Sequence, residues 1–438
     1  MLKETLGGAT WFPRPAAGAS LAPHVGSADE PQPGSLTGIH PTSPRLEADT
    51  PDRTLTTPSR APLRVAAHNG ARTYGGGEKW TVLLLRGLSE RGHRVHLFCN
   101  FEEIAERARA EGVDASVAVL GGHLALWQAW AFASRLRAFA PDALLVSTFK
   151  KVWLAGFAAH RAGVARVVSR IGLDSDLPGK HWTYRLAFRR WVDAALVNAE
   201  GIRREVVRTL PRYDPARVAT VYDGVAAPHA SLGRREARAA LGLPHDVPVI
   251  GSVTRLSRQK RLDRLLGAMA LLPRIHCALA GVGELEDQLR SQVRTLGLED
   301  RVHFLGYRSD VGTVLAALDA FVLTSDREGM ANAMLEAMAA GVPVVSTPVS
   351  GADEALAPDG NGQAPGVIVE GAPPALAAAL RGVLDDAAAR SAMSEEGRRR
   401  AREWFGYRRM VDAWEGVLGG DPPAFWDARR DASPGKER

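Results

Sequence analysis

The sequence predicts an α/β protein built from two similar halves, each a parallel β-sheet with helices wound on both faces. From residue 63 onward, short apolar runs alternate with amphipathic stretches, which is typical of successive β-α-β units. The alternation stops and starts afresh near residues 223–246. The length of 438 residues agrees, because one domain usually takes roughly 100–200 residues. We therefore expect an N-terminal domain over 63–223 and a C-terminal domain over 224–418.

The apolar runs give the expected strands in chain order. Those of the first half are Leu63–His68, Arg94–Cys99, Ala115–Leu120, Ala143–Ser147, Ala165–Ser169, Ala194–Asn198 and Val218–Tyr222. Those of the second half are Val247–Val253, Ile275–Ala280, Val302–Leu305, Ala320–Leu323, Val342–Ser346 and Val367–Val369. After Pro374 the chain is helical in character, and Trp404, Phe405, Met410 and Trp414 predict an amphipathic helix that packs onto the body.

Both ends of the chain differ from this pattern. Residues 1–62 hold ten of the 27 prolines and show no apolar periodicity, which predicts a disordered Pro-rich tail. Residues 419–438 are again polar and rich in Pro and Gly, so we expect a second, flexible tail there.

Composition excludes several classes of protein. The formal charge of +6 is small for this length and no nucleic-acid-binding motif accompanies it, so no nucleic-acid partner is expected. Cys99 and Cys277 are too few for a disulfide framework or a four-ligand zinc site and favour a reducing, cytoplasmic compartment. No apolar run is long enough to span a bilayer, and the first residues do not form a signal peptide.

A glycine-rich turn follows the first expected strand. Gly75, Gly76 and Gly77 stand between that strand and an amphipathic helix from about Trp80 to Arg91. Glycines at such a turn let the backbone approach a ligand and direct helix amides at an anion. A tight turn without any ligand accounts for the pattern equally well.

Two cations follow the first strand of the second half. Arg255 comes two residues after Val253, and Lys260 stands at the start of a helix over Leu262–Leu272. Only seven of the 55 basic residues are lysines, so a lysine here favours a compact point charge. Together they would bind a diphosphate without a metal, although a solvated basic loop gives the same pattern.

The most specific segment runs from Glu328 to Glu336. Glu328 lies in the loop after the strand Ala320–Leu323, and Glu336 lies one to two turns into the next helix. One carboxylate can then face a sugar, the amides at the helix start can meet a phosphate, and the second carboxylate can reach a ribose. Small residues between them, and Gly341-Val342-Pro343-Val344-Val345 after them, set this segment apart from two glutamates on a solvated helix.

With these motifs in order, residues 63–415 resemble retaining GT-B-fold glycosyltransferases of the family 4 type. The resemblance rests on Gly76-Gly77 after the first strand, Arg255 with Lys260, the Glu-x7-Glu segment and the turn at Ser350-Gly351-Ala352-Asp353-Glu354. It implies two facing Rossmann-like domains with an interdomain cleft. It also implies transfer of a hexose-type sugar from a UDP- or GDP-linked donor to a glycan, lipid-linked or small-molecule acceptor, as in cell-surface polysaccharide or glycolipid synthesis.

The resemblance also implies roles for single residues. Arg255 and Lys260 would bind the donor diphosphate, Glu336 the ribose, and Glu328 would face the transferred sugar, so Glu328, Arg255 and Lys260 are the expected catalytic groups. The remaining donor contacts would come from Gly76, Gly77, Gly283, Gly329, Met330 and Ala331. No metal and no cofactor is expected, since the nucleotide-sugar is a co-substrate.

The acceptor side departs from the family pattern. Many members carry a histidine near the reacting sugar, where this chain has Ser147-Thr148. Lys150, Lys151 and Arg170 are the candidates for this face, with plain surface charge as the alternative. Asp174 and Asp176 have the spacing of a metal-binding pair in glycosyltransferases of another fold, but the Arg255 and Lys260 pair argues against a metal.

Three alternatives remain open. A nucleotide-sugar epimerase shares the fold, and a non-catalytic sugar-nucleotide-binding protein would keep it as well. The basic and aromatic stretch from Arg185 to Arg208 is either an ordinary solvated helix face or a peripheral contact with the inner face of the cell membrane.

Overall fold

The computed structural model describes residues 61–122, 124–173, 182–226 and 232–427. The tail predicted over residues 1–62 lies outside the described residues except for Ala61 and Pro62. Asp174 and Asp176 also lie outside them.

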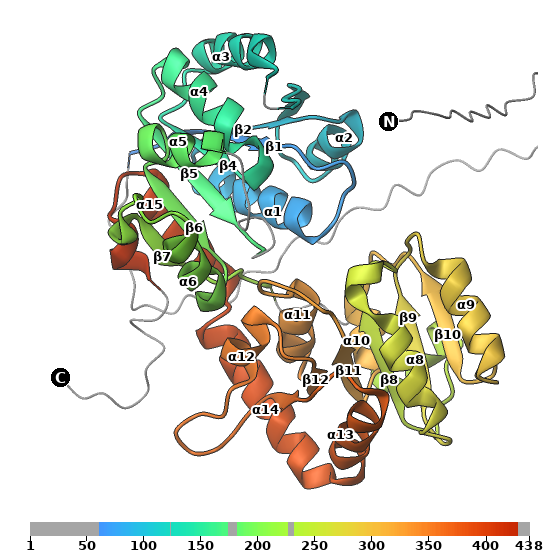
Figure 1. The fold of residues 1–438 in the computed structure, drawn as a ribbon. Coiled ribbons are helices and arrows are strands. Elements are labelled where there is room, and N and C mark those ends of the chain that lie inside the picture. The colour runs from blue at the N-terminus through green and yellow to red at the C-terminus, as the bar shows by residue number, and fades with distance from the viewer. Residues whose placement is uncertain (1–60, 123, 174–181, 227–231, 428–438) are drawn as a thin grey trace, which may run out of the picture. The chain divides into compact units, whose positions relative to one another are not determined.

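The first sheet has seven parallel strands in the order β3-β2-β1-β4-β5-β6-β7 (Figure 1). Its strands are β1 Arg64–Asn69, β2 Arg94–Cys99, β3 Ala115–Val117, β4 Ala143–Val146, β5 Arg166–Ile171, β6 Ala194–Val197 and β7 Val218–Thr220. Its helices are α1 Gly76–Glu90, α2 Glu102–Ala110, α3 Leu126–Phe139, α4 Val152–Ala162, α5 Trp182–Arg190 and α6 Glu200–Thr209, and a 3-10 turn, η1, spans Phe149–Lys151.

The second sheet has six parallel strands in the order β10-β9-β8-β11-β12-β13. Its strands are β8 Val249–Val253, β9 His276–Ala280, β10 Val302–Gly306, β11 Ala320–Leu323, β12 Val344–Ser346 and β13 Gly366–Ile368. The helices are α7 Arg234–Ala240, α8 Leu262–Ala270, α9 Glu286–Thr295, α10 Val311–Ala317, α11 Asn332–Ala340, α12 Ser350–Leu356, α13 Pro373–Asp385, α14 Ala387–Glu403 and α15 Tyr407–Leu418. All thirteen predicted strands are present, so the predicted fold class is confirmed.

Each sheet is covered on both faces, which explains why its strands are almost uniformly apolar. On the first sheet, α3, α4, α5 and α6 bury one face, and α1, α2 and α15 bury the other. On the second sheet, α8, α9 and α13 cover one face, and α7, α10, α11, α12 and α14 cover the other. Cys99 and Cys277 are both buried within strands, as predicted.

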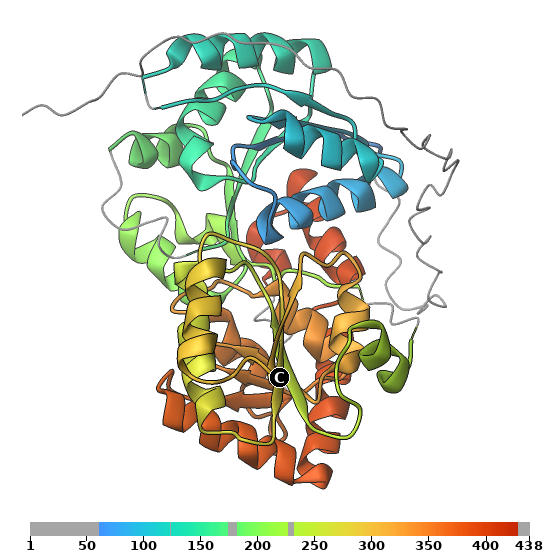
Figure 2. The ribbon, with the colours of Figure 1, turned by 90° about the vertical axis from the view of Figure 1, so that its right-hand side faces the viewer.

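Helix α15 completes the core of the first sheet, although the sequence assigns it to the C-terminal domain. Trp414 packs edge-to-face on Trp80 with ring centroids 5.0 Å apart, and Trp80 Nε1 donates to the sulfur of Met410 at 2.9 Å. In Figure 2 this helix, in red, lies beside the blue α1. The amphipathic pattern predicted a packed helix correctly but assigned it to the wrong half, because an apolar stripe does not identify its partner.

The body also extends beyond residue 418. Residues 423–426 form a 3-10 helix, η5, that packs near β7, and Trp426 Nε1 donates to Asp421 at 3.0 Å. The flexible tail predicted from residue 419 therefore begins too early, because the segment to Asp427 buries Pro423 and part of Trp426.

The chain passes between the two halves twice, near residues 224–225 and near residues 405–410, and these two segments lie side by side. The Val225 amide donates to the Phe405 carbonyl oxygen at 2.8 Å, and a Cβ on Gly224 would lie 2.7 Å from that of Met410. Glycine is needed there because the two crossings are too close for a side chain. The boundary predicted at residue 223 stays a prediction. Among the described residues, none of the helices combines the length and apolar character needed to cross a bilayer.

Candidate active site

The loops after β8 and β11 are tied together at the carboxyl edge of the second sheet, where parallel sheets usually carry their ligands. β8 and β11 are neighbours in that sheet. The Asp326 amide donates to the Gln259 carbonyl oxygen at 2.9 Å, and Gln259 Nε2 donates back to the Arg327 carbonyl oxygen at 2.6 Å. The two loops that carry Lys260 and Glu328 are therefore held as one unit.

Arg261, next to Lys260, has a left-handed backbone with φ 49°, which is unfavourable for a residue with a side chain. Its guanidinium forms ion pairs with Asp263 at 2.9 Å and with Asp326 at 3.2 Å. These contacts offset the strain and fix the turn that leads from Lys260 into α8.

Lys260 and Glu328 contact each other directly. Their side chains form an ion pair, and the Ser325 hydroxyl donates to the same Glu328 oxygen at 2.7 Å. Thr324 holds the Lys260 backbone by donating to its carbonyl oxygen at 2.9 Å. Glu328 is only 9% exposed, so it needs such partners in place of water. The sequence named Lys260 and Glu328 as separate candidates, but it did not predict their contact or the support from Ser325 and Thr324.

Arg255 is exposed and reaches the glycine turn of the first half. A Cβ on Gly75 would lie 2.6 Å from a nitrogen of the Arg255 guanidinium, so the end of the arginine side chain lies directly against this glycine. Gly76 and Gly77 are the first residues of α1, and Asn332 Nδ2 of α11 lies 3.4 Å from the Gly76 carbonyl oxygen. The glycine turn thus lies against both the Arg255 loop and the start of α11.

Glu336 lies in the second turn of α11, as predicted, and its carboxylate forms an ion pair. Lys79 of α1 places its ammonium 3.0 Å from Glu336 Oε1. The Glu336 side chain is 15% exposed and that of Lys79 is 52% exposed. The sequence did not assign Lys79 to the site.

Gly329, Met330 and Ala331 are buried between β11 and α11. A side chain on Gly329 would overlap the Gly172 carbonyl oxygen and the Asn198 amide oxygen, which follow β5 and β6 of the first sheet. The close approach requires glycine at position 329.

Gly283 belongs to the loop after β9, which contacts the Arg255 loop. The Leu256 amide donates to the Val282 carbonyl oxygen at 3.0 Å, and a side chain on Gly283 would overlap the Leu256 backbone. Gly283 therefore has a structural reason to be glycine, and its predicted contact with the donor stays a prediction.

Lys150 and Lys151 lie in the turn η1 after β4. Lys150 is exposed, whereas Lys151 is half-buried and donates to the Gly121 carbonyl oxygen at 3.0 Å. Burial lowers the pKa of Lys151, and the neighbouring charges of Arg72 and Lys150 lower it further. Several cations thus gather at the carboxyl edge of the first sheet, a setting that suits an anionic ligand.

Arg170 at the end of β5 is committed to an ion pair that the sequence did not predict. Its guanidinium donates to Asp223 at 2.8 and 3.0 Å and lies 4.1 Å from the ring centre of Trp80. Asn198 donates to Asp223 at 2.7 Å. Arg170 is 8% exposed, so its first role is to satisfy a buried carboxylate, and its contact with an acceptor stays a prediction.

His68 does not take the place of the histidine that many family members carry near the sugar, although it lies near the carboxyl end of β1, at the same edge of the sheet. His68 is fully buried, its Nε2 lies 3.1 Å from the Ala118 carbonyl oxygen, and burial lowers its pKa to about 4. It is therefore a neutral core residue. Within the described parts of the chain, no three His, Cys, Asp or Glu side chains gather in a way that could hold a metal ion.

Both halves of the chain match known glycosyltransferase families. The family described as glycosyl transferases group 1 matches residues 233–400, and glycosyltransferase family 4 matches residues 74–227. A lipopolysaccharide core biosynthesis glycosyltransferase, LpsE of Rhizobium meliloti, is 32% identical over 54% of this chain and 67% of its own. A D-inositol 3-phosphate glycosyltransferase of Kineococcus radiotolerans is 33% identical over 52% of this chain and 60% of its own.

The fold has solved counterparts. The crystal structure of Anabaena HepE, determined with UDP and glucose, matches with a TM-score of 0.71 over 82% of this chain and all of HepE. At 18% identity this likeness concerns the fold alone.

Proposed function

This chain belongs to the glycosyl transferases group 1 family of GT-B-fold enzymes, and we propose that it transfers a hexose-type sugar from a UDP- or GDP-linked donor with retention of configuration. The proposal depends above all on the contact of Lys260 and Ser325 with Glu328, between the ends of β8 and β11. This contact sets a fixed carboxylate beside a cation, as a sugar linked to a diphosphate would require.

The donor phosphates would meet Arg255 and Lys260. Both cations belong to the loop after β8, and Arg255 also touches the glycine turn at Gly75. Charge-assisted hydrogen bonds from such groups stabilise the negative charge that grows on the leaving diphosphate. Either a UDP- or a GDP-linked donor satisfies this arrangement. Neither a metal nor a cofactor is part of the proposal.

The proposed step breaks the bond between the anomeric carbon of the sugar and the phosphate oxygen. The acceptor hydroxyl oxygen bonds to that carbon on the same face, and its proton passes to the departing phosphate oxygen. Glu328 would orient the sugar and stabilise positive charge on its ring, while Glu336 would hold the ribose hydroxyls. Gly329, Met330 and Ala331 would contribute backbone amides.

We propose an acceptor that is a glycan or is lipid-linked, at the cytoplasmic face of the cell membrane. One relative supports this, since it is named for lipopolysaccharide core biosynthesis. Another is named for D-inositol 3-phosphate, so a small-molecule acceptor is the alternative. Lys150 and Lys151 are the acceptor-side candidates because they add positive charge at the carboxyl edge of the first sheet.

Nucleotide release from UDP- and GDP-hexoses, measured with and without acceptor extracts, tests the proposal. Release that depends on an acceptor is expected, and the anomeric coupling in the product's NMR spectrum should match that of the donor. Inverted coupling would contradict retention. Interconversion of the donor without release would replace transfer by epimerisation, and tight donor binding with neither reaction would indicate a binding protein.

A further inference from the structure

Tryptophan is concentrated on the outer side of the first half. Five of the ten tryptophans lie on α3, on α4, and on or directly after α5: Trp127, Trp130, Trp153, Trp182 and Trp191. We call the surface made by these five residues and the helices that carry them the aromatic face. Helix α4 packs against both α3 and α5, so the three helices form one continuous surface (Figure 1).

The rings of the aromatic face form an unbroken series of contacts. Trp130 meets Phe157 at 6.3 Å, Phe157 meets Trp191 at 5.7 Å, Trp191 meets Trp153 at 5.0 Å, and Trp153 meets Trp182 at 6.0 Å. Both ends of the series are open to solvent, since Trp130 is 46% and Trp182 62% exposed. Beside Trp130, at helical spacing, Trp127 is 69% exposed. Large apolar rings grouped in this way mark a contact surface.

The same helices carry only positive charge. The sequences of α3, α4 and α5 contain no Asp or Glu, although the chain has 49 acidic residues in 438. They contain Arg135, Arg137, Arg161, Arg185, Arg189 and Arg190. Arg161 lies 4.4 Å from the ring centre of Trp130, so the charge and the aromatic rings are interleaved. Tryptophan with arginine and no acid is the composition that favours the interface of an anionic membrane.

A cavity of about 530 Å³ opens at the Trp182 end of this surface. Arg185, Arg189 and Arg212 line it together with apolar side chains of Leu186, Leu210 and Pro211. No described residue forms an ion pair or hydrogen bond with the side chains of these three exposed arginines. Tyr213 lines the cavity as well, and its buried hydroxyl has no hydrogen-bond partner. Three exposed guanidinium groups among apolar side chains favour an anion with apolar surroundings.

We propose that the aromatic face docks on an anionic phospholipid bilayer and that this cavity takes a lipid phosphate. The proposal rests on the membrane location proposed above and on none of the transfer chemistry. The aromatic face overlaps with the Arg185–Arg208 stretch that the sequence indicated, through Arg185, Arg189 and Trp191. It extends to α3 and α4 and leaves out Arg203, which donates to the Val218 carbonyl oxygen at 3.0 Å.

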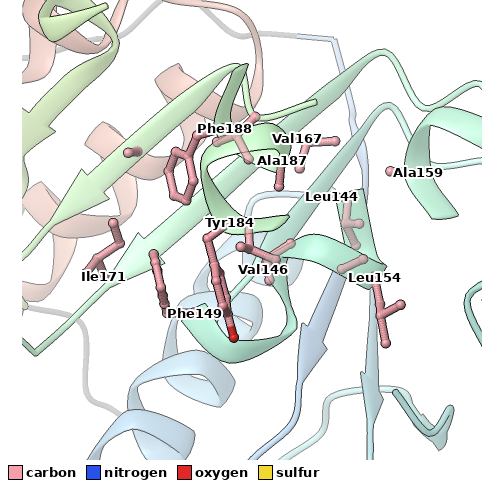
Figure 3. Close-up of a cluster of buried hydrophobic side chains, with 14 of the residues drawn as sticks. Leu144, Val146, Phe149, Leu154, Ala159, Val167, Ile171, Tyr184, Ala187 and Phe188 are labelled. Carbon is pink, nitrogen blue, oxygen red and sulfur yellow. The ribbon is translucent and has the colours of Figure 1, made fainter. Parts of the chain in front are cut away.

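Docking there would bring the membrane close to the acceptor-side candidates. Tyr184 of α5 stacks on Phe149 with ring centroids 5.1 Å apart (Figure 3), and its hydroxyl donates to the Lys150 carbonyl oxygen at 3.4 Å. The helix that carries Trp182 and Arg185 is thus in direct contact with the turn that carries Lys150 and Lys151. A lipid-linked acceptor anchored in the bilayer would have a short path to that turn.

Sedimentation of the full chain with phosphatidylcholine vesicles, with and without phosphatidylglycerol, tests the proposal. We expect salt-sensitive binding to the phosphatidylglycerol vesicles, accompanied by a blue shift of tryptophan emission. The triple variant Arg185→Gln/Arg189→Gln/Arg212→Gln should weaken that binding about 100-fold, from the usual contribution of each arginine near an anionic surface. The variant Trp127→Ser/Trp182→Ser should weaken binding and reduce the blue shift.

The matched control is Arg274→Gln/Arg294→Gln/Arg381→Gln, which removes three exposed arginines of the second half. It should bind like the wild type. Equal losses in both arginine triples, or no vesicle binding at all, would overturn the proposal. Dimers seen by sedimentation velocity in the wild type but not in the tryptophan variant would also overturn it, because the face would then bind a second copy of the chain. Complete displacement of the protein from vesicles by millimolar inorganic phosphate, at constant ionic strength, would overturn it as well. Nucleotide release with a detergent-solubilised acceptor should be unchanged in every variant, which separates this proposal from the proposed transfer.

Discussion

The ammonium group of Lys79 on α1 lies 3.0 Å from Glu336 Oε1 on α11. A cation from the first half is therefore paired with the carboxylate that we propose binds the ribose. The two residues are 257 positions apart. A donor nucleotide would have to displace this cation before its ribose hydroxyls could reach Glu336.

Removal of the ammonium in Lys79→Met should therefore tighten nucleotide binding. Because Lys79 is 52% exposed, the pair is worth at most about 1 kcal/mol, which limits the gain to about fivefold. Calorimetric titration with UDP and GDP measures it, with Lys79→Arg as a charge-conserving control and Glu336→Gln as a variant that should bind more weakly. Weaker binding by Lys79→Met would mean that Lys79 itself holds the donor.

The pairing of Lys260 with Glu328 predicts a coupled loss of stability. In Lys260→Ala the nearly buried Glu328 keeps only Ser325 as a partner, so unfolding free energy should fall by about 1–3 kcal/mol. The double variant Lys260→Ala/Glu328→Gln should recover part of this loss, because no buried charge remains.

Denaturant unfolding of the wild type, both single variants and the double variant gives the coupling energy of the cycle. All three variants should lose sugar transfer. Additive losses of stability would mean that the two side chains do not interact in solution, and full activity of Glu328→Gln would remove this residue from the proposed mechanism.

Activity should persist after metal removal. Arg255 and Lys260 supply the positive charge that a divalent ion provides elsewhere, so prior dialysis against EDTA should leave the transfer rate unchanged. Loss of activity with EDTA, restored by magnesium or manganese but not by sodium, would show that a cation takes part. Asp174→Asn and Asp176→Asn would then be the variants to test.

The strands could be predicted from the sequence because each is a short, nearly continuous apolar run bounded by polar residues. Val344 and Val345 of β12, for example, are completely buried, and such positions are filled almost always by apolar residues. The Glu328 to Glu336 segment was recognisable because its loop and helix are consecutive in the chain. Gly329 adds to the signal, since its close approach to Gly172 excludes every other residue.

Contacts between distant segments could not be predicted in the same way. Local periodicity shows that α15 has an apolar stripe, but Trp414 finds Trp80 only in the folded chain. The pair of Arg170 with Asp223 left a weaker trace: an arginine within the buried run of β5 requires a carboxylate, and Asp223 follows β7 in the same sheet. Lys79 left none, because it is an ordinary exposed position of an amphipathic helix.

Glu354 predicts how stability should depend on pH. On α12, Glu354 accepts the Glu200 amide at the start of α6 at 2.6 Å, and burial raises its pKa above the ordinary value of 4.5. The folded protein therefore holds this proton more tightly than the unfolded chain. As pH rises from about 4.5 through the raised pKa, Glu354 loses its proton and the free energy of unfolding falls. Above the raised pKa this loss stays constant.

The substitution Glu354→Gln keeps an oxygen that accepts the same amide but removes the buried charge. Its melting temperature relative to wild type should thus become more favourable as pH rises from about 4.5 toward 8, measured by circular dichroism at fixed ionic strength. The exposed neighbour Asp353, changed to Asn, is the control and should show no such trend. A difference that is flat with pH, or that favours wild type increasingly at higher pH, would mean that the charged carboxylate stabilises the contact between α12 and α6.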